Sequence, residues 1–87
     1  MNHNYIQTNR QKPLRMANSF LRDALEKLEE KQYFEALCIF EKAYYHAEEA
    51  THMADSFNTF LQSMKIKLLC GTMMNSAVDI QGKTKRD

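Results

Sequence analysis

Glycine and proline are almost absent from this chain. The 87 residues include one proline and two glycines, and neither residue occurs between Leu14 and Cys70. Both residues interrupt helices, so an uninterrupted stretch of this length favours helix. No apolar run of about 18 residues occurs either, and the polar N-terminus lacks the apolar centre of a signal peptide. We therefore expect no membrane partner and a cytoplasmic location.

Cysteine is also scarce, and the sequence contains no obvious catalytic or metal-binding motif. Cys38 and Cys70 are the only cysteines, and their spacing of 32 residues matches neither a metal site nor a disulfide framework. Cys38 lies in an apolar helical segment, which predicts a buried structural thiol. Glu49 and His52 have the spacing of half a di-iron site, but the second half is missing. We predict no enzyme, catalytic residues, metal or cofactor.

Acidic side chains are missing from the N-terminal segment. Residues 1–15 carry a local charge of +3, residues 16–50 carry −4 and residues 51–87 carry +2, which sum to the net +1. Such an alternation is usually a set of solvated helix faces. Nucleic-acid binding is therefore disfavoured, although the basic ends leave a small DNA-binding regulator as the third functional alternative.

Apolar residues recur at helical spacing in two segments. The first segment, 14–30, carries Leu14, Ala17, Leu21, Ala24, Leu25 and Leu28. The pattern stops near Lys31-Gln32 and restarts at Tyr33, with Ala36, Leu37, Phe40, Ala43, Tyr44, Ala47 and Ala50. Because this second segment has apolar residues on more than one side, we expect it to be the central and most buried helix.

A third helix is predicted to follow without a strong stop signal. Thr51, Asp55, Ser56 and Asn58 are the candidate caps, and Gly71 is the candidate C-terminal cap. Residues 72–81 have enough apolar side chains for a short fourth helix. The predicted fold is an all-α antiparallel helical hairpin bundle with three long helices. A disordered N-terminal arm (1–12), one helical domain (13–81) and a flexible tail (82–87) complete this description.

One internal similarity suggests that the chain contains two related helical units. Asn18-Ser19-Phe20-Leu21 is echoed forty residues later by Asn58-Thr59-Phe60-Leu61. The echo is either a degenerate repeat or a coincidence between two amphipathic helices.

The run Leu28-x4-Tyr33-x-Glu35-Ala36-x3-Phe40-x-Lys42-Ala43 resembles the tetratricopeptide repeat, and Phe20 and Ala24 match its first helix. The match covers residues 20–44. Asp23 and Lys27 replace apolar residues, and Lys31 replaces the usual turn glycine. The three-helix domain that binds tail motifs in membrane-trafficking proteins is similar in length. The resemblance implies a peptide- or helix-binding scaffold, such as a small adaptor or a chaperone of the type III secretion kind.

The apolar residues are too numerous for a core of this size, so some should remain exposed as a binding surface. We predict an interaction module that binds a partner helix or peptide in an apolar groove. The candidate groove residues are Ile39, Tyr45, Leu61, Met64, Leu68, Met73 and Met74. The alternative is self-association with a second copy, in a structural or regulatory role.

Overall fold

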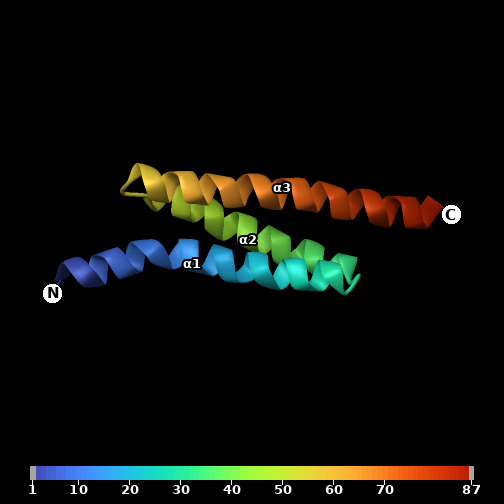
Figure 1. Cartoon of the computed structure of the whole chain (residues 1–87), viewed down its shortest axis with the longest axis horizontal. Helices are drawn as coiled ribbons and strands as arrows, with labels where there is room; N and C mark the ends of the chain where they lie inside the picture. The colour runs from blue at the N-terminus through green and yellow to red at the C-terminus, as the bar shows by residue number, and fades with distance from the viewer. Residues whose placement is uncertain (1, 87) are drawn as a thin grey trace.

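Three helices make up the computed structural model, which describes the backbone of residues 2–86 and the side chains of residues 11–76. They are α1 (Asn2–Glu29), α2 (Tyr33–Met53) and α3 (Phe57–Arg86), and no strand occurs in residues 2–86. Consecutive helices run in opposite directions, so α1 and α3 point the same way (Figure 1). The prediction of an all-α helical bundle is confirmed. The Cα trace of the protein measures 58 × 19 × 14 Å along its principal axes.

The outer helices are longer than the sequence pattern predicted. Helix α1 begins at Asn2 rather than at residue 14, and it includes residues 2–12, where an arm was expected. Helix α3 continues through Gly71 to Arg86, so the predicted cap at Gly71 is wrong and no separate fourth helix occurs in residues 2–86. Gly71 does not have a positive φ, and Thr72 Oγ1 donates to the Leu68 carbonyl at 3.0 Å. Glycine permits a helix end but does not require one.

Pro13 lies inside α1 rather than in its first turn. A proline within a helix has no N–H to donate to the carbonyl four residues earlier, and its ring displaces that turn. Figure 1 shows α1 bending in this part of the helix. The ring itself is buried, so packing against the rest of the protein offsets part of the local cost.

The turn between α1 and α2 is at the predicted break. Lys31 has a φ of 63°, in the left-handed region that L-residues rarely adopt. The N–H of Gln32 donates to the Lys27 carbonyl at 2.9 Å, and the N–H of Lys31 donates to the Leu28 carbonyl at 3.0 Å. This pair of hydrogen bonds defines a Schellman motif, with Lys31 at the position that glycine normally occupies.

Helix α3 starts with a serine cap, one of the four candidates predicted. The Thr59 N–H donates to Ser56 Oγ at 3.2 Å, which satisfies one of the free N–H groups in the first turn. Ser56 Oγ also donates to Thr59 Oγ1 at 3.0 Å. The short connection of residues 54–56 therefore ends at this cap, and α3 begins directly after it.

The core is built around one stripe of α2. Its buried residues are spaced alternately by four and three positions, and four of the five are alanines: Ala36, Phe40, Ala43, Ala47 and Ala50. Opposite them, α1 buries Ala17 and Ala24, while α3 buries Ser63, Ile66 and Cys70. Ser63 is accommodated because its hydroxyl donates to helix carbonyls within α3 at 2.9 Å. Small side chains let the helices approach closely, and the spacing is that of a coiled-coil seam.

The two cysteines lie in opposite environments. Cys38, which was predicted to be buried, is exposed, whereas Cys70 is buried in the core. Cys38 is two residues from both Ala36 and Phe40, and a two-residue step turns a helical side chain about 200° away from the buried stripe. Burial raises the pKa of the Cys70 thiol to about 11, because the thiolate would be poorly solvated there.

The forty-residue echo does not correspond to equivalent environments. Phe20 is partly buried and packs against the core, but Phe60 is 40% exposed. Ala17 is fully buried, whereas its counterpart Phe57 is 76% exposed. The repeated residues therefore face different directions on α1 and α3, and the packing does not follow the repeat.

Candidate interaction surfaces

Helices α1 and α3 pack on the same side of α2. Glu35 and His46, on one edge of the α2 stripe, contact α1: Lys27 Nζ lies 3.7 Å from Glu35 Oε2, and the Phe20 ring stacks on His46 at 5.4 Å. On the other edge, Lys67 of α3 lies 3.9 Å from Glu48 Oε2 and 5.6 Å from the Tyr44 ring centroid. The side of α2 opposite the stripe remains exposed.

This arrangement leaves one position of a four-helix bundle unfilled. In an antiparallel four-helix bundle, each helix packs on two neighbours and faces the fourth across the diagonal. Here α2 packs extensively against both α1 and α3, while α1 and α3 barely touch. The three helices therefore occupy three corners, and the fourth corner adjoins α1 and α3.

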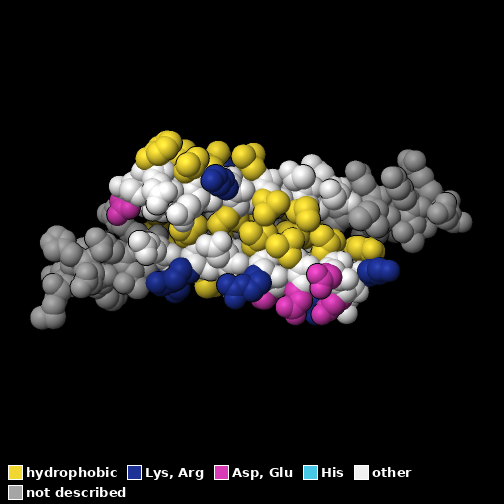
Figure 2. All heavy atoms as spheres, viewed as in Figure 1, with side chains coloured by type: hydrophobic (Ala, Val, Ile, Leu, Met, Phe, Trp, Pro, Cys, Tyr) yellow, Lys and Arg dark blue, Asp and Glu magenta, His cyan; other side chains and the backbone are white. Residues whose placement is uncertain are grey.

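Apolar side chains line that corner. Since Phe20 and Lys27 turn toward the outer edge of α2, the other flank of α1 faces α3, and the same reasoning applies to α3 on the side away from Lys67. Figure 2 shows a band of hydrophobic side chains between α1 and α3. We call this surface the open face: Leu21, Leu25, Leu28, Leu69 and Met73. Leu25 is 38% exposed and Leu69 is 41% exposed.

Bases without acids occur beside the open face in residues 11–22 of α1 and in residues 56–76 of α3. No carboxylate occurs in residues 11–22 or in residues 56–76. Arg22 precedes Leu25 by three residues and Lys65 precedes Leu69 by four, so each base lies next to an open-face leucine. Within residues 11–76, neither base forms an ion pair. Glu26 and Glu29, four and seven positions after Arg22, are the first carboxylates on this edge.

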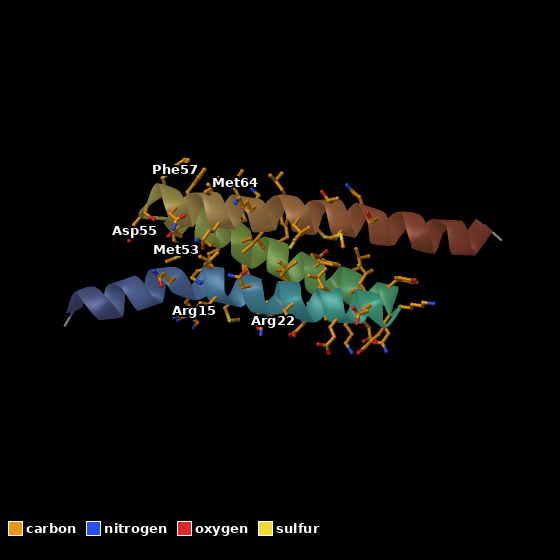
Figure 3. The ribbon with its side chains drawn as sticks, viewed as in Figure 1. Arg15, Arg22, Met53, Asp55, Phe57 and Met64 are labelled. Carbon is orange, nitrogen blue, oxygen red and sulfur yellow. The ribbon has the colours of Figure 1, made fainter. Side chains whose placement is uncertain are left out.

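A second apolar surface lies on the outside of α3. We call it the outer stripe: Phe57, Leu61, Met64 and Leu68, which are spaced by four, three and four residues. Phe57 is 76% exposed, Leu61 is 40% exposed and Leu68 is 68% exposed. Figure 3 shows Phe57 and Met64 on the part of α3 that lies away from Arg15 and Arg22 of α1. Helix α3 is therefore apolar both where it packs and where it faces solvent.

Part of the outer stripe borders a hollow of about 320 Å³ between α2 and α3. Met64 and Leu68 line it together with Tyr44, Lys67 and Gly71. Lys67 is held there by Glu48 and the Tyr44 ring, so the hollow has one oriented cation beside apolar walls. A bulky apolar side chain from a partner would fit such a hollow next to the stripe.

The seven residues predicted to form one groove are divided among several surfaces. Leu61, Met64 and Leu68 lie together on the outer stripe. Tyr45 is 68% exposed but belongs to the opposite, solvent-facing side of α2. Three others are partly buried and pack against the core: Ile39, Met73 and Met74.

Sequence reasoning missed the most exposed aromatic residue and the open face. Phe57 was not among the predicted binding residues, although it is the most exposed large apolar side chain in residues 11–76. The sequence signal that could have identified Phe57 is the four-three-four spacing of Phe57, Leu61, Met64 and Leu68, which places these residues on one side of the helix. Leu25 and Leu69 could be recognised only once α1 and α3 were placed.

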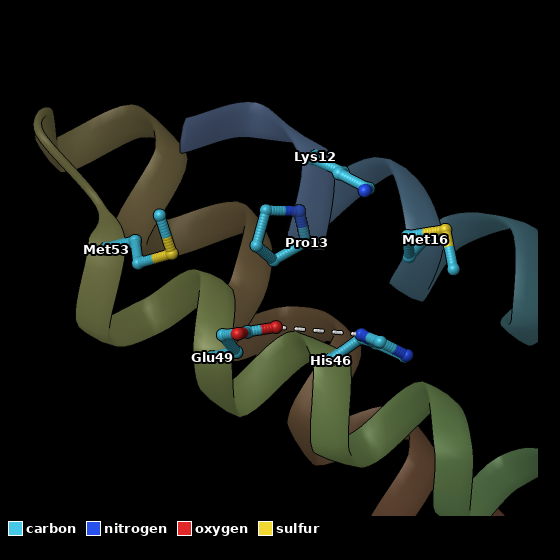
Figure 4. A pocket seen from close by; sticks show the side chains of 6 residues that line it. All are labelled: Lys12, Pro13, Met16, His46, Glu49 and Met53. Carbon is cyan, nitrogen blue, oxygen red and sulfur yellow. Dashed lines mark ion pairs between the residues drawn. The ribbon is translucent and has the colours of Figure 1, made fainter. Parts of the chain in front are cut away.

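A different hollow, of about 340 Å³, lies between α1 and the second half of α2. It is lined by Lys12, Pro13, Met16, His46, Glu49 and Met53. Figure 4 shows His46 and Glu49 of α2 below the α1 side chains, with Nδ1 of His46 lying 3.7 Å from Oε1 of Glu49. That nitrogen is buried and has no hydrogen-bond partner within the described residues. Glu49 therefore approaches His46 rather than pairing with His52, and His52 is exposed.

The described side chains form no cluster of metal ligands. Among residues 11–76, no group of three or more His, Cys, Asp or Glu side chains could hold a metal ion.

No helix in the part of the chain that the structure describes is long and apolar enough to cross a membrane.

Comparison with known proteins yields no match among family models, curated proteins or solved structures.

Proposed function

We propose that this protein is a small interaction module that binds a helix of another protein through the outer stripe of α3. Three of the four stripe residues are 40% exposed or more. A helix that is apolar on every side belongs in an interior, so a solvated α3 of this composition favours a partner. The exposed outer stripe is the observation on which the proposal rests.

The chemistry of the stripe suits helix-on-helix packing. Its four-three-four spacing matches the seam into which a second amphipathic helix can pack, and Leu68 adjoins the hollow beside Tyr44. Between residues 56 and 76, the only charges on α3 are Lys65 and Lys67. Depletion of charge is typical of the centre of protein interfaces. The tetratricopeptide-like pattern of residues 20–44 supports the same class, an adaptor or chaperone without enzymatic activity.

We place this activity in the cytoplasm. Both cysteines are free, and Cys38 is exposed at the surface, which suits a compartment where thiols stay reduced.

The alternative is that a second copy covers the outer stripe. The stripe carries no carboxylate, and an antiparallel α3 pair would bury it symmetrically without opposing acids. Sedimentation at several concentrations separates the two proposals. A monomer at all concentrations favours a foreign partner, and a dimer that Leu61→Gln dissociates favours self-association.

The test of the proposed function is affinity purification from the native host with a matched set of variants. We expect wild-type protein to retain one or more proteins that a Leu61→Gln, Leu68→Gln double variant does not retain. The control is Tyr45→Gln on α2, which removes an equally exposed apolar side chain from another surface. If the double variant retains the same proteins as wild type, the outer stripe is not the binding surface.

A further inference from the structure

The open face differs from the outer stripe, and its shape and charge point to a particular occupant. Its leucines repeat along α1 at spacings of four and three, from Leu21 to Leu25 and Leu28. Leu69 and Met73, spaced by four, line the α3 side. Two parallel helices with apolar flanks turned toward one another present a site for one more helix, packed on both.

The size of the band is suited to a helix of ordinary length. The α1 flank extends from Leu14 to Leu28, which is about 21 Å at the rise of an α-helix. A partner helix packed on both α1 and α3 would run in the same direction as α2 and would lie diagonally across the bundle from α2. In that position its apolar stripe would cover Leu25 and Leu69, the two open-face leucines that are most exposed.

The charged residues beside the open face indicate which kind of helix would bind there. Arg15, Arg22 and Lys65 lie beside the open face, and no carboxylate occurs in residues 11–22 of α1 or 56–76 of α3, whereas Glu26 and Glu29 follow at the far end of the α1 flank. A helix flanked by lysines would be repelled along the part of the face beside Arg15, Arg22 and Lys65, and one flanked by glutamates would be attracted there. Charges at a solvated rim contribute modestly to affinity, so the apolar band supplies most of the binding and the bases supply selectivity.

A second copy of the chain is a poorer match to this surface. The helix of another copy with the most exposed large apolar side chains is α3, and its charges between residues 56 and 76 are two lysines. Docking α3 of one copy on the open face of another would therefore bring lysine toward Arg22 and Lys65. Nucleic acid would satisfy the bases but would leave the leucines between them uncovered.

We propose that the open face binds an amphipathic helix of another protein whose apolar stripe is flanked by glutamate or aspartate, which completes a four-helix bundle. This site goes beyond the proposed function, because it is a separate surface and its occupant has a stated chemistry. The two sites can be disabled independently, on the open face at Leu69 and on the outer stripe at Leu61.

The experiment measures binding of two synthetic peptides to the full chain by fluorescence anisotropy. Both peptides are about 21 residues long, with leucine at the first and fourth positions of each heptad. One has glutamate beside the leucines and the other has lysine. We expect the glutamate peptide to bind at least about tenfold more tightly, and its binding to weaken as salt is raised from about 0.05 M to about 0.5 M.

Variants then locate the site. Leu69→Gln should weaken binding of the glutamate peptide about tenfold, whereas Leu61→Gln, which changes a leucine of nearly equal exposure on the same helix, should leave it unchanged. The double variant Arg22→Gln, Lys65→Gln should weaken binding about threefold to tenfold. Lys42→Gln, which removes a base of α2, is the charge control. Circular dichroism confirms that each variant is folded.

Several outcomes would overturn the proposal. Equal binding of the lysine peptide refutes the acidic chemistry, and equal effects of Leu61→Gln and Leu69→Gln refute the position. Binding of neither peptide refutes a helix as the occupant. Self-association that Leu69→Gln abolishes assigns the face to a second copy, and duplex DNA binding that depends on Arg22 and Lys65 but not on Leu69 assigns it to nucleic acid. None of these results alters the outcome of the outer-stripe purification.

Discussion

Lys31 holds a backbone conformation that glycine would hold at lower cost. Its φ of 63° lies in the left-handed region, where an L-residue is destabilised by about 1–2 kcal/mol. Lys31→Gly removes that cost and retains the N–H that donates to Leu28. Glycine also gains conformational entropy in the unfolded chain, which offsets about 0.5–1 kcal/mol of the benefit. We expect a net gain of about 0.5–1 kcal/mol in the free energy of unfolding.

The measurement is urea unfolding followed by far-UV circular dichroism, with a thermal melt as a second readout. For a domain of this size, the gain corresponds to a rise in Tm of about 2–8 °C. The matched control is Glu26→Gly, five residues earlier, where an exposed residue lies inside α1 and glycine should cost about 1 kcal/mol. The two glycines must therefore have opposite effects. If both lower the free energy of unfolding equally, Lys31 does not adopt the left-handed conformation and this account of the turn is wrong.

Three further predictions concern packing and accessibility. Ala43→Leu should lower the free energy of unfolding by about 1–3 kcal/mol, because Ala43 is fully buried, while the exposed Glu41→Leu should change it by less than about 0.5 kcal/mol; equal urea midpoints would refute the close helix contact. Gly71→Ala should raise the free energy of unfolding by about 0.5–1 kcal/mol in the same assay, because no atom lies within 4 Å of the added methyl group; a loss would mean that α3 is interrupted there. Iodoacetamide should modify Cys38 of the native protein at neutral pH and leave Cys70 unmodified, because Cys70 is buried and its pKa is raised to about 11. Equal labelling of both cysteines by mass spectrometry would contradict their placement.

Much of the helical structure follows from local sequence signals. The helical spacing from Ala36 to Ala50 marks one continuous stripe of seven residues, of which the structure buries five and leaves Leu37 and Tyr44 partly exposed. The break near Lys31 was visible because the apolar phase restarts at Tyr33. Ser56 was among the predicted caps because its short hydroxyl side chain can accept a hydrogen bond from the first turn. These signals act over a few residues, so a sequence can display them.

Helix ends were harder to predict than helix interiors. Gly71 and Pro13 have the composition of boundaries, yet both lie inside helices. Propensity expresses a difference of about 1 kcal/mol for glycine and about 3 kcal/mol for proline. Hydrogen bonds and packing along a long helix can exceed either value. Pro13 is buried, which is consistent with such an override.

The candidate surfaces could be predicted only in part. The outer stripe was partly anticipated, since Leu61, Met64 and Leu68 were among the predicted binding residues. Cys38 was assigned to the wrong environment and Phe57 was left out of the predicted binding residues, because α2 and α3 each have apolar residues on more than one side. Periodicity identifies such stripes but does not state which of them meets a neighbouring helix.

The sequence by itself determined that this chain is helical, that the first turn lies near Lys31 and which stripe of α2 is apolar throughout. Those properties depend on backbone propensity and on spacing within one helix. Only the tertiary structure decided that α1 and α3 pack on the same side of α2 and barely touch each other, which leaves Leu25 and Leu69 at an open corner beside Arg22 and Lys65. That arrangement depends on close packing among Ala17, Ala24 and the α2 alanines, residues far apart in the chain. No spacing within a single helix encodes it.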